Sequence, residues 1–141
     1  MAVCVKGAHH RELALGAIEA GKHVFCEWPL ALDTAQAREI ASAAERRGVC
    51  TVVGLQGRAS PYVNAVRELV AEGTIGRIIS ATLISSLNNW GPSLPASEAY
   101  RTGRESGATG LTVPGGHSLD TFCHCLGEFA ELSAIVTTQD R

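Results

Sequence analysis

Three short apolar runs separated by two helical segments are the feature that most constrains how this chain folds. The runs predict strands at Ala2–Val5, His23–Cys26 and Val49–Val53. The segments between them space apolar residues three and four apart, as an amphipathic helix does. Strands and helices that alternate through short turns form βαβ units, whose strands are parallel. The first 56 residues therefore predict a parallel sheet covered by helices.

Helix boundaries and buried faces follow from the same pattern. The first helix is expected over His10–Ala20, and the second begins at a capping Asp33, with Gln36 three residues on, and ends at Gly48. The apolar positions predict the residues that face the core: Leu13, Ala14, Ala17 and Ile18 in the first helix, and Ala37, Ile40, Ala41 and Ala44 in the second.

Residues 57–141 change character and predict a second, α+β part. Ser60–Pro61 is typical of a helix start, and Ser118–Leu126 has the pattern of another helix. Alternating apolar and polar residues predict a long strand at Arg77–Leu87, and a last strand is expected at Leu132–Thr138. Between them, Asn88–Gly116 is rich in Gly, Pro, Ser and Asn and is expected to be mainly loop.

Composition excludes several classes of protein. The formal net charge is −2 and Lys and Arg form no stripe, so no nucleic-acid contact is expected. No apolar run reaches the length of a membrane span, and no signal-peptide pattern opens the chain, so a cytoplasmic protein is expected. The five cysteines show no framework spacing, which argues against a disulfide scaffold. Cys4, Cys26 and Cys50 stand in apolar runs and are expected in the core.

Three stretches resemble one enzyme family. They are AVCVKGAHHRELALGAIEAGKHVFCEWPLALD, GLQGRASPYVNAVRELVAEGTIGRIISATL and GGHSLDTFCHCLGE, in that order. Together they resemble the glucose-fructose oxidoreductase/inositol dehydrogenase (Gfo/Idh/MocA) family, and EWPLALD and GLQGR are similar to its fungal galactose-gene repressor branch. The resemblance implies an α/β fold: the second half of a Rossmann sheet (residues 1–56), followed by the start of an α+β substrate domain (residues 57–141). Relative to the family, we expect the chain to be truncated at both ends.

Departures from the family pattern bear on the cofactor. Members of the family bind NAD(P), but this chain contains no G-x-G-x-x-G turn, which holds the pyrophosphate of a dinucleotide. The resemblance places Trp28 where the family has the catalytic Lys of Glu-Lys-Pro, and Val113 where dehydrogenase members carry an Asp. We therefore expect this chain alone to use no dinucleotide cofactor.

Candidate site residues come from the resemblance and from helical spacing. His117 and Asp120 match the family's Gly-x-His-x-x-Asp helix and are the expected acid–base pair, with Asp120 orienting the His117 ring. His124 shares their face, although a solvent-exposed polar face explains that stripe equally. The other expected substrate contacts are Glu27 and Trp28 at the carboxyl edge of the sheet, Arg58 after the third strand, and Trp90 and Tyr100 in the long loop. No metal site is expected.

Three functions remain open from the sequence. The first is a small-molecule enzyme that uses the family pocket for cofactor-free acid–base chemistry: isomerisation, elimination or cyclisation. The second is an NAD(P)-dependent oxidoreductase fragment acting on a sugar-like or polyol substrate, and the third is a non-catalytic regulator or binding module. The partners expected are a small-molecule ligand and a second copy of the chain, since the strands at Ala2–Val5 and Arg77–Leu87 leave apolar edges to cover.

Overall fold

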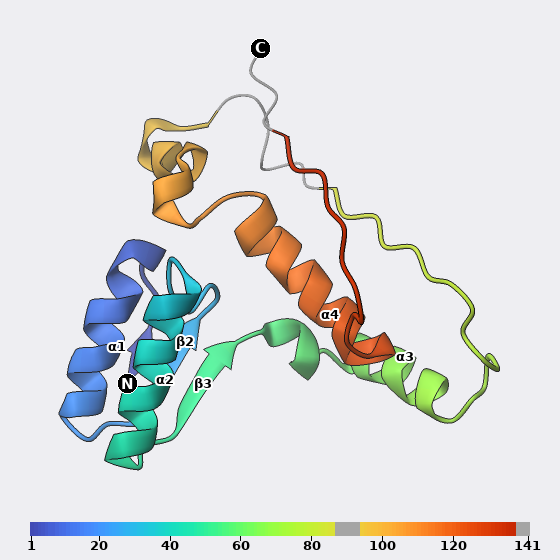
Figure 1. Ribbon diagram of the computed structural model, residues 1–141, viewed down its shortest axis with the longest axis horizontal. Helices are drawn as coiled ribbons and strands as arrows, with labels where there is room; N and C mark the ends of the chain where they lie inside the picture. Colours follow the sequence, from blue (N-terminus) through green and yellow to red (C-terminus); the bar gives the residue numbers. More distant parts are fainter. Residues whose placement is uncertain (87–93, 138–141) are drawn as a thin grey trace.

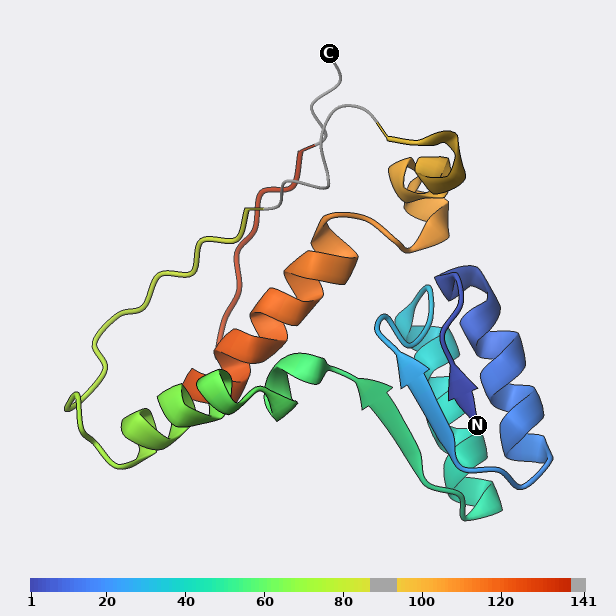
Figure 2. The same cartoon turned by 180° about the vertical axis from the view of Figure 1, so that it is seen from behind.

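The computed structural model describes residues 1–86 and 94–137, and the apolar runs of its first part form a parallel sheet. The strands are β1 (Ala2–Val3), β2 (Val24–Glu27) and β3 (Thr51–Gly54), in the order β1-β2-β3. Helices α1 (His10–Glu19) and α2 (Thr34–Arg47) pack against each other and cover one face of the sheet, while the view from behind shows the other face uncovered (Figures 1 and 2).

The core lies between the two helices and the sheet. Its members are Val3, Ala14, Ala17, Ile18, Val24, Cys26, Ile40, Ala43 and Ala44. Ile18 and Ile40 are 0% and 2% exposed, and burial of each such side chain contributes about 2 kcal/mol to folding. The register pairs Val3 with Cys26 and Cys26 with Val53, so these three side chains share the helix-covered face.

Four of the residues expected in the core are exposed. Cys4 follows the buried Val3 and therefore points away from the core, as alternation in a strand requires. Cys50 lies just before β3 and is also exposed. In the helices, Leu13 and Ala41 lie outside the buried stripes, and Ala43 takes the inward place in α2. Cys26 is buried as expected, and burial raises the pKa of its thiol to about 11, so it is a core residue and not a nucleophile.

Local signals fix the ends of α2 as the sequence predicts. The Asp33 carboxylate accepts from the Gln36 backbone N–H at 2.8 Å. The Gln36 side chain accepts from the Leu32 N–H at 3.4 Å, one residue before the partner that a capping box would use. Gly48 ends the helix with φ 63°, a left-handed conformation that glycine adopts without a steric cost.

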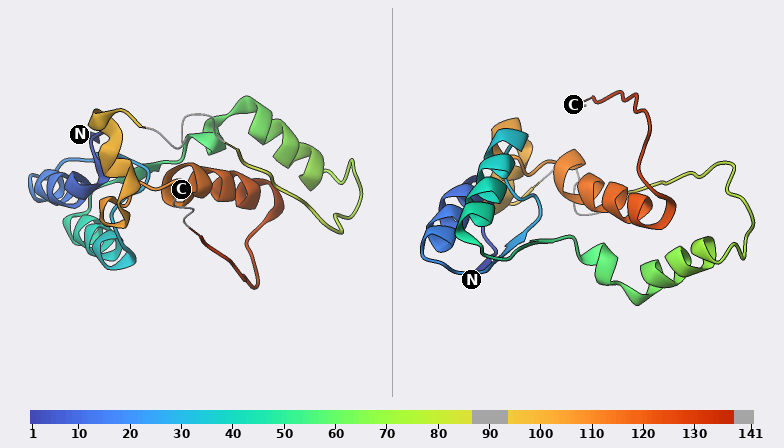
Figure 3. Two further views of the ribbon diagram at one scale, coloured as in Figure 1. Left: turned by 90° about the horizontal axis from the view of Figure 1, so that it is seen from above. Right: turned by 60° about the horizontal axis from the view of Figure 1, so that its bottom comes forward.

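The second part is built on two helices that pack against each other, α3 (Pro61–Ala71) and α4 (Gly116–Leu126). A short turn η2 (Gln56–Ala59) joins β3 to α3. The chain before α4 forms a run of short turns beyond the ends of the strands (Figures 1 and 3). These are η3 (Ala96–Thr102), η4 (Arg104–Ser106) and the π-helical turn η5 (Leu111–Gly115), and a similar turn, η1 (Gly7–His9), precedes α1.

In their described parts, the two strands expected in the second part do not form. Residues 77–86 of the first expected strand and 132–137 of the second have no strand structure in the part of each that the structure describes. A strand requires a hydrogen-bonded neighbour, and within the described ranges the sheet contains only β1, β2 and β3. The apolar side chains of these segments are therefore exposed, with Ile79 at 88%, Ile84 at 87% and Ile135 at 94%.

Candidate functional site

The carboxyl edge of the parallel sheet is where the two parts of the chain meet. β2 ends at Glu27, and Trp28 then projects from a turn that contains a cis peptide bond to Pro29. The Trp28 indole N–H donates to the Thr112 carbonyl in η5 at 2.7 Å. Beside it, the Lys6 ammonium lies 4.6 Å from the centre of the Tyr100 ring, a cation–π contact that joins the β1–α1 turn to η3.

Trp28 lies directly against the first residue of α4. A Cβ atom added to Gly116 would stand 2.5 Å from the Trp28 Nε1 and 2.8 Å from two ring carbons. Only glycine allows the indole this close to the helix backbone. Gly116 was not singled out from the sequence, although it directly precedes the candidate His117 in a Gly-Gly pair.

One face of α4 packs on η2 and α3. The Asp120 carboxylate accepts from Arg58, and an added Cβ on Gly57 would stand 2.5 Å from the Thr121 hydroxyl oxygen. One turn further on, the His124 Nε2 is 3.0 Å from the Asn64 side-chain oxygen. At Asp120 and His124, the stripe that sequence spacing leaves open as a solvent-exposed polar face is therefore in contact with η2 and α3.

His117 occupies the first turn of α4 on this same face. It lies three and four residues before Asp120 and Thr121, so helical geometry stacks it above them. Its neighbour Gly116 is the contact of Trp28, which places His117 between the Trp28 contact and the Arg58–Asp120 contact. Within residues 1–86 and 94–137, the structure gives the His117 imidazole no hydrogen bond or ion pair.

Asp120 pairs with Arg58 and not with His117. The Arg58 Nε lies 2.9 Å and 3.1 Å from the two carboxylate oxygens, and its second terminal nitrogen, Nη2, is 2.6 Å from Oδ1. The pairing raises the pKa of Arg58, chiefly through these hydrogen bonds and then through the charge of Asp120. Asp120 is 11% exposed and Arg58 49%. The expectation that Asp120 orients the His117 ring does not match this arrangement, because Arg58 already holds the carboxylate.

Of the other expected substrate contacts, two lie at the carboxyl edge of the sheet and one falls outside the described residues. Glu27 lies at the carboxyl edge as predicted, and its side chain is 45% exposed. Tyr100 is 38% exposed and lies over Lys6. Trp90 falls outside the described residues.

His10 is the residue at this edge that the sequence did not reveal. Although it is the first residue of α1, its side chain is only 1% exposed. Its ring nitrogens lie 2.7 Å from the Pro29 carbonyl oxygen and 2.8 Å from that of Val5. Its place as the first residue of the helix that follows the first strand was the available signal.

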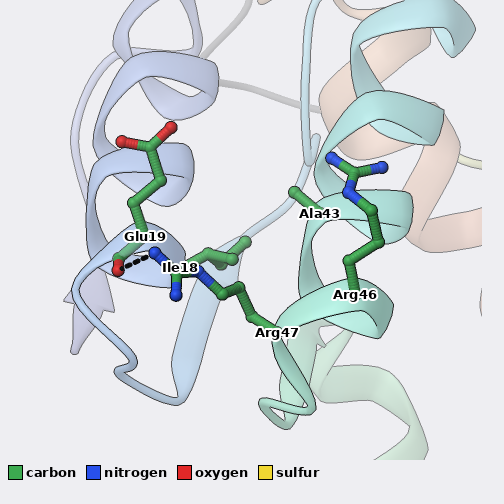
Figure 4. A pocket seen from close by; sticks show the side chains of 5 residues that line it. All are labelled: Ile18, Glu19, Ala43, Arg46 and Arg47. Carbon is green, nitrogen blue, oxygen red and sulfur yellow. Dashed lines mark hydrogen bonds between the residues drawn. The ribbon is translucent and has the colours of Figure 1, made fainter.

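Other features of the described residues add no second site. A hollow of about 390 Å³ lies between the carboxyl ends of α1 and α2, where Arg47 donates to the Glu19 carbonyl (Figure 4). Helices in βαβ units run opposite to the strands, so this hollow is at the far end of the sheet from Trp28. Over residues 1–86 and 94–137, no three His, Cys, Asp or Glu side chains gather as metal ligands, and no helix is long and apolar enough to cross a membrane.

A double-mutant cycle should show that the Arg58–Asp120 pair stabilises the packing of α4 on η2. Exchanging Arg58→Met and Asp120→Asn singly and together should give a coupling of about 0.5–1 kcal/mol, because half of the Arg58 side chain is exposed to solvent. Urea unfolding of the four proteins measures it. Arg11→Met and Glu39→Gln are the matched control: that pair has similar geometry with both partners about 45% exposed and should couple less. Additive effects at Arg58 and Asp120 would show that the pair contributes nothing.

Comparison with known proteins identifies the family. A model described as "Oxidoreductase family, NAD-binding Rossmann fold" matches residues 1–55, and one described as "Gal80p, C-terminal domain" matches residues 61–141. The chain belongs to the Gfo/Idh/MocA family. The family accounts for the Rossmann-type sheet of the first part and for a second part similar to the galactose regulator.

Individual relatives are of two kinds. Dehydrogenase aclE of Aspergillus oryzae is 38% identical over 94% of this chain and 36% of its own length. The galactose/lactose metabolism regulatory protein GAL80 of Saccharomyces cerevisiae is 32% identical over 95% of this chain and 33% of its own. Among solved structures, a levoglucosan dehydrogenase in complex with NADH and levoglucosan aligns with a TM-score of 0.81 at 26% identity, covering 98% of this chain and 37% of that one. The chain thus spans about a third of the length of these relatives.

Proposed function

We propose that this chain carries the small-molecule site of an oxidoreductase-family protein and transfers protons there without a nicotinamide. The observation that supports this is the position of His117 between the Trp28 contact and the Arg58–Asp120 contact. An indole has a single N–H donor, and that of Trp28 is used by Thr112. Because the His117 imidazole has no hydrogen-bond partner within the described residues, we assign the proton exchange with a ligand to it, and Trp28 is proposed to supply an apolar surface beside it.

The chemistry that fits is acid–base chemistry on a sugar-like carbonyl compound. His117 as a base removes a proton from the carbon next to the carbonyl, and as an acid it returns that proton to another atom. The net result is an isomerisation, or an elimination or cyclisation where the substrate has a suitable group. Each of these reactions leaves the overall oxidation level of the substrate unchanged, so no oxidant is needed. Asp120, held by Arg58, fixes the turn of α4 that follows His117, and Glu27 and Tyr100 are proposed to bind substrate hydroxyls.

Proton exchange in heavy water tests this proposal. The full chain is incubated with a panel of aldoses and ketoses, including D-glucose and D-fructose, and proton NMR follows deuterium entry next to the carbonyl. We expect exchange above the protein-free rate without added nicotinamide, and a loss of about 10²–10⁴-fold in His117→Ala, the range of general acid–base catalysis. His9→Ala, the same change at an exposed histidine, is the control. Absence of exchange across the panel would contradict the proposal.

The second candidate is an NAD(P)-dependent oxidoreductase acting on a sugar or polyol, favoured by the dehydrogenase relatives and by the likeness to the levoglucosan dehydrogenase that holds NADH. The residues of this chain do not fit the phosphate end of such a cofactor. Neither strand-to-helix turn, residues 4–9 or 28–33, has glycines spaced as G-x-G-x-x-G, and the buried His10 fills the start of α1.

Titration calorimetry separates the two candidates. We expect this chain to bind none of the four nicotinamide forms at micromolar concentration, because the backbone N–H groups that hold a pyrophosphate are not supplied by its turns. Levoglucosan with NAD⁺ or NADP⁺ serves as the activity probe. A micromolar dissociation constant, or reduced nicotinamide absorbance at 340 nm, would favour the dehydrogenase. If there is neither turnover nor nicotinamide binding, the resemblance to the galactose regulator makes a binding module the better interpretation.

A further inference from the structure

His10 contacts both residues that flank Trp28. Its Nδ1 lies 2.7 Å from the carbonyl oxygen of Pro29, the residue after Trp28. Its Nε2 lies 2.8 Å from the carbonyl oxygen of Val5, just beyond β1, and 3.7 Å from the carboxylate of Glu27, the residue before Trp28. One buried side chain therefore joins the start of α1, the end of β1 and the turn that carries Trp28.

Two backbone carbonyl oxygens lie within hydrogen-bond distance of the ring nitrogens of His10. A carbonyl oxygen accepts but does not donate, so each of the two bonds needs a hydrogen on the ring nitrogen. A neutral imidazole carries one such hydrogen and donates to one of the two carbonyls, and the tautomer decides which. The Glu27 carboxylate is a third polar group near the ring, 3.7 Å from Nε2, and its side chain is 45% exposed and so remains hydrated.

We propose that His10 is a positioning residue for Trp28, acting through the backbone of the turn. The Pro29 carbonyl and the Glu27 carboxylate fix the turn on either side of the indole, and the indole then reaches Thr112 and Gly116. The inference rests on the proposed function in one respect, namely that Trp28 forms one side of the ligand site. A buried polar residue that only filled space would not need two backbone acceptors from separate elements.

Fluorine NMR of the full chain labelled with 5-fluorotryptophan tests this positioning directly. The chain contains two tryptophans, Trp28 and Trp90, so the spectrum has two resonances, and Trp28→Phe assigns them. In His10→Leu we expect the Trp28 resonance to move towards its position in the urea-unfolded chain, because the turn has lost its contact with the ring at the Pro29 carbonyl. His9→Leu, the same change one residue earlier at an exposed site, should leave it in place.

His10→Gln is the conservative variant that should partly restore the contact, and it serves as the test if His10→Leu does not fold. Its side-chain amide can donate to one of the two carbonyls, so the Trp28 resonance should lie between those of the wild type and His10→Leu. Circular dichroism establishes which variants fold. The proposal is overturned if the Trp28 resonance keeps its wild-type position in folded His10→Leu or, should that variant be unfolded, in His10→Gln. The measurement needs no ligand, so its failure is distinct from the failure of the proton-exchange experiment.

Discussion

Replacing Gly116 with alanine should destabilise the protein by about 1–3 kcal/mol, the usual cost of forcing extra atoms into a packed site. The new Cβ would stand 2.5 Å from the Trp28 Nε1, closer than any two such atoms can approach. The obstacle is a rigid indole, so the ring itself must move, and with it the 2.7 Å bond to Thr112. We expect both a lower free energy of unfolding, measured in urea, and a change in Trp28 fluorescence, read in a Trp90→Phe background.

Gly16→Ala is the matched control for this prediction. Gly16 is also a helical glycine, in α1, and an added Cβ would meet nothing within 4 Å. Because alanine is the better helix former, Gly16→Ala should stabilise the chain by up to about 1 kcal/mol. The clash with Trp28 can be isolated with Trp28→Leu, which removes the ring: the effects of Gly116→Ala and Trp28→Leu should then be less than additive. Equal effects of alanine at the two glycines would refute the close contact.

Signals carried by residues close together in the sequence predicted structure correctly, and signals that need a distant partner did not. The capping contact of Asp33 and Gln36 spans three residues, and the helix it starts is found where expected. The parallel strands could be predicted because each buried strand is a short apolar run that can be seen without knowing its neighbours. The strands expected at 77–87 and 132–138 failed in their described parts, because alternation describes a face and does not supply a neighbouring strand.

In the candidate site too, local spacing predicted which residues share a face but not which residues contact them. Helical spacing placed His117, Asp120 and His124 on one face, which is correct. The spacing could not show what covers that face, because the partner of Asp120 is Arg58, 62 residues earlier. His10 escaped notice for a related reason: its partners are the backbone carbonyls of Val5 and Pro29, and every residue type offers the same carbonyl. A side chain that binds backbone carbonyls therefore cannot be matched to its partners from residue types alone.

The exposed apolar segments lead to the prediction of a dimer. Residues 78–86 and 131–137 have no regular structure and lie apart from the sheet (Figures 1 and 3), and Ile79, Ile84 and Ile135 are each more than 85% exposed. An extended segment with free N–H and C=O groups is a template for pairing with another chain. We propose that a second copy covers these segments, because a two-fold axis brings identical segments together and satisfies both at once. The proposed dimer would give the alternating pattern of Arg77–Leu87 the neighbouring strand that one chain lacks.

Sedimentation velocity over a wide dilution range tests the dimer. We expect twice the chain mass at micromolar concentration, and a shift to monomer mass in Ile79→Asp, because a charge would then have to be buried at the interface without a partner. Val52→Asp is the matched control: Val52 is 52% exposed on the uncovered face of the sheet, apart from the extended segments. If Val52→Asp dissociates the dimer and Ile79→Asp does not, the second copy binds the sheet face instead. Monomer mass for the unaltered chain at high micromolar concentration would refute the dimer, and the exposed isoleucines would then need another explanation.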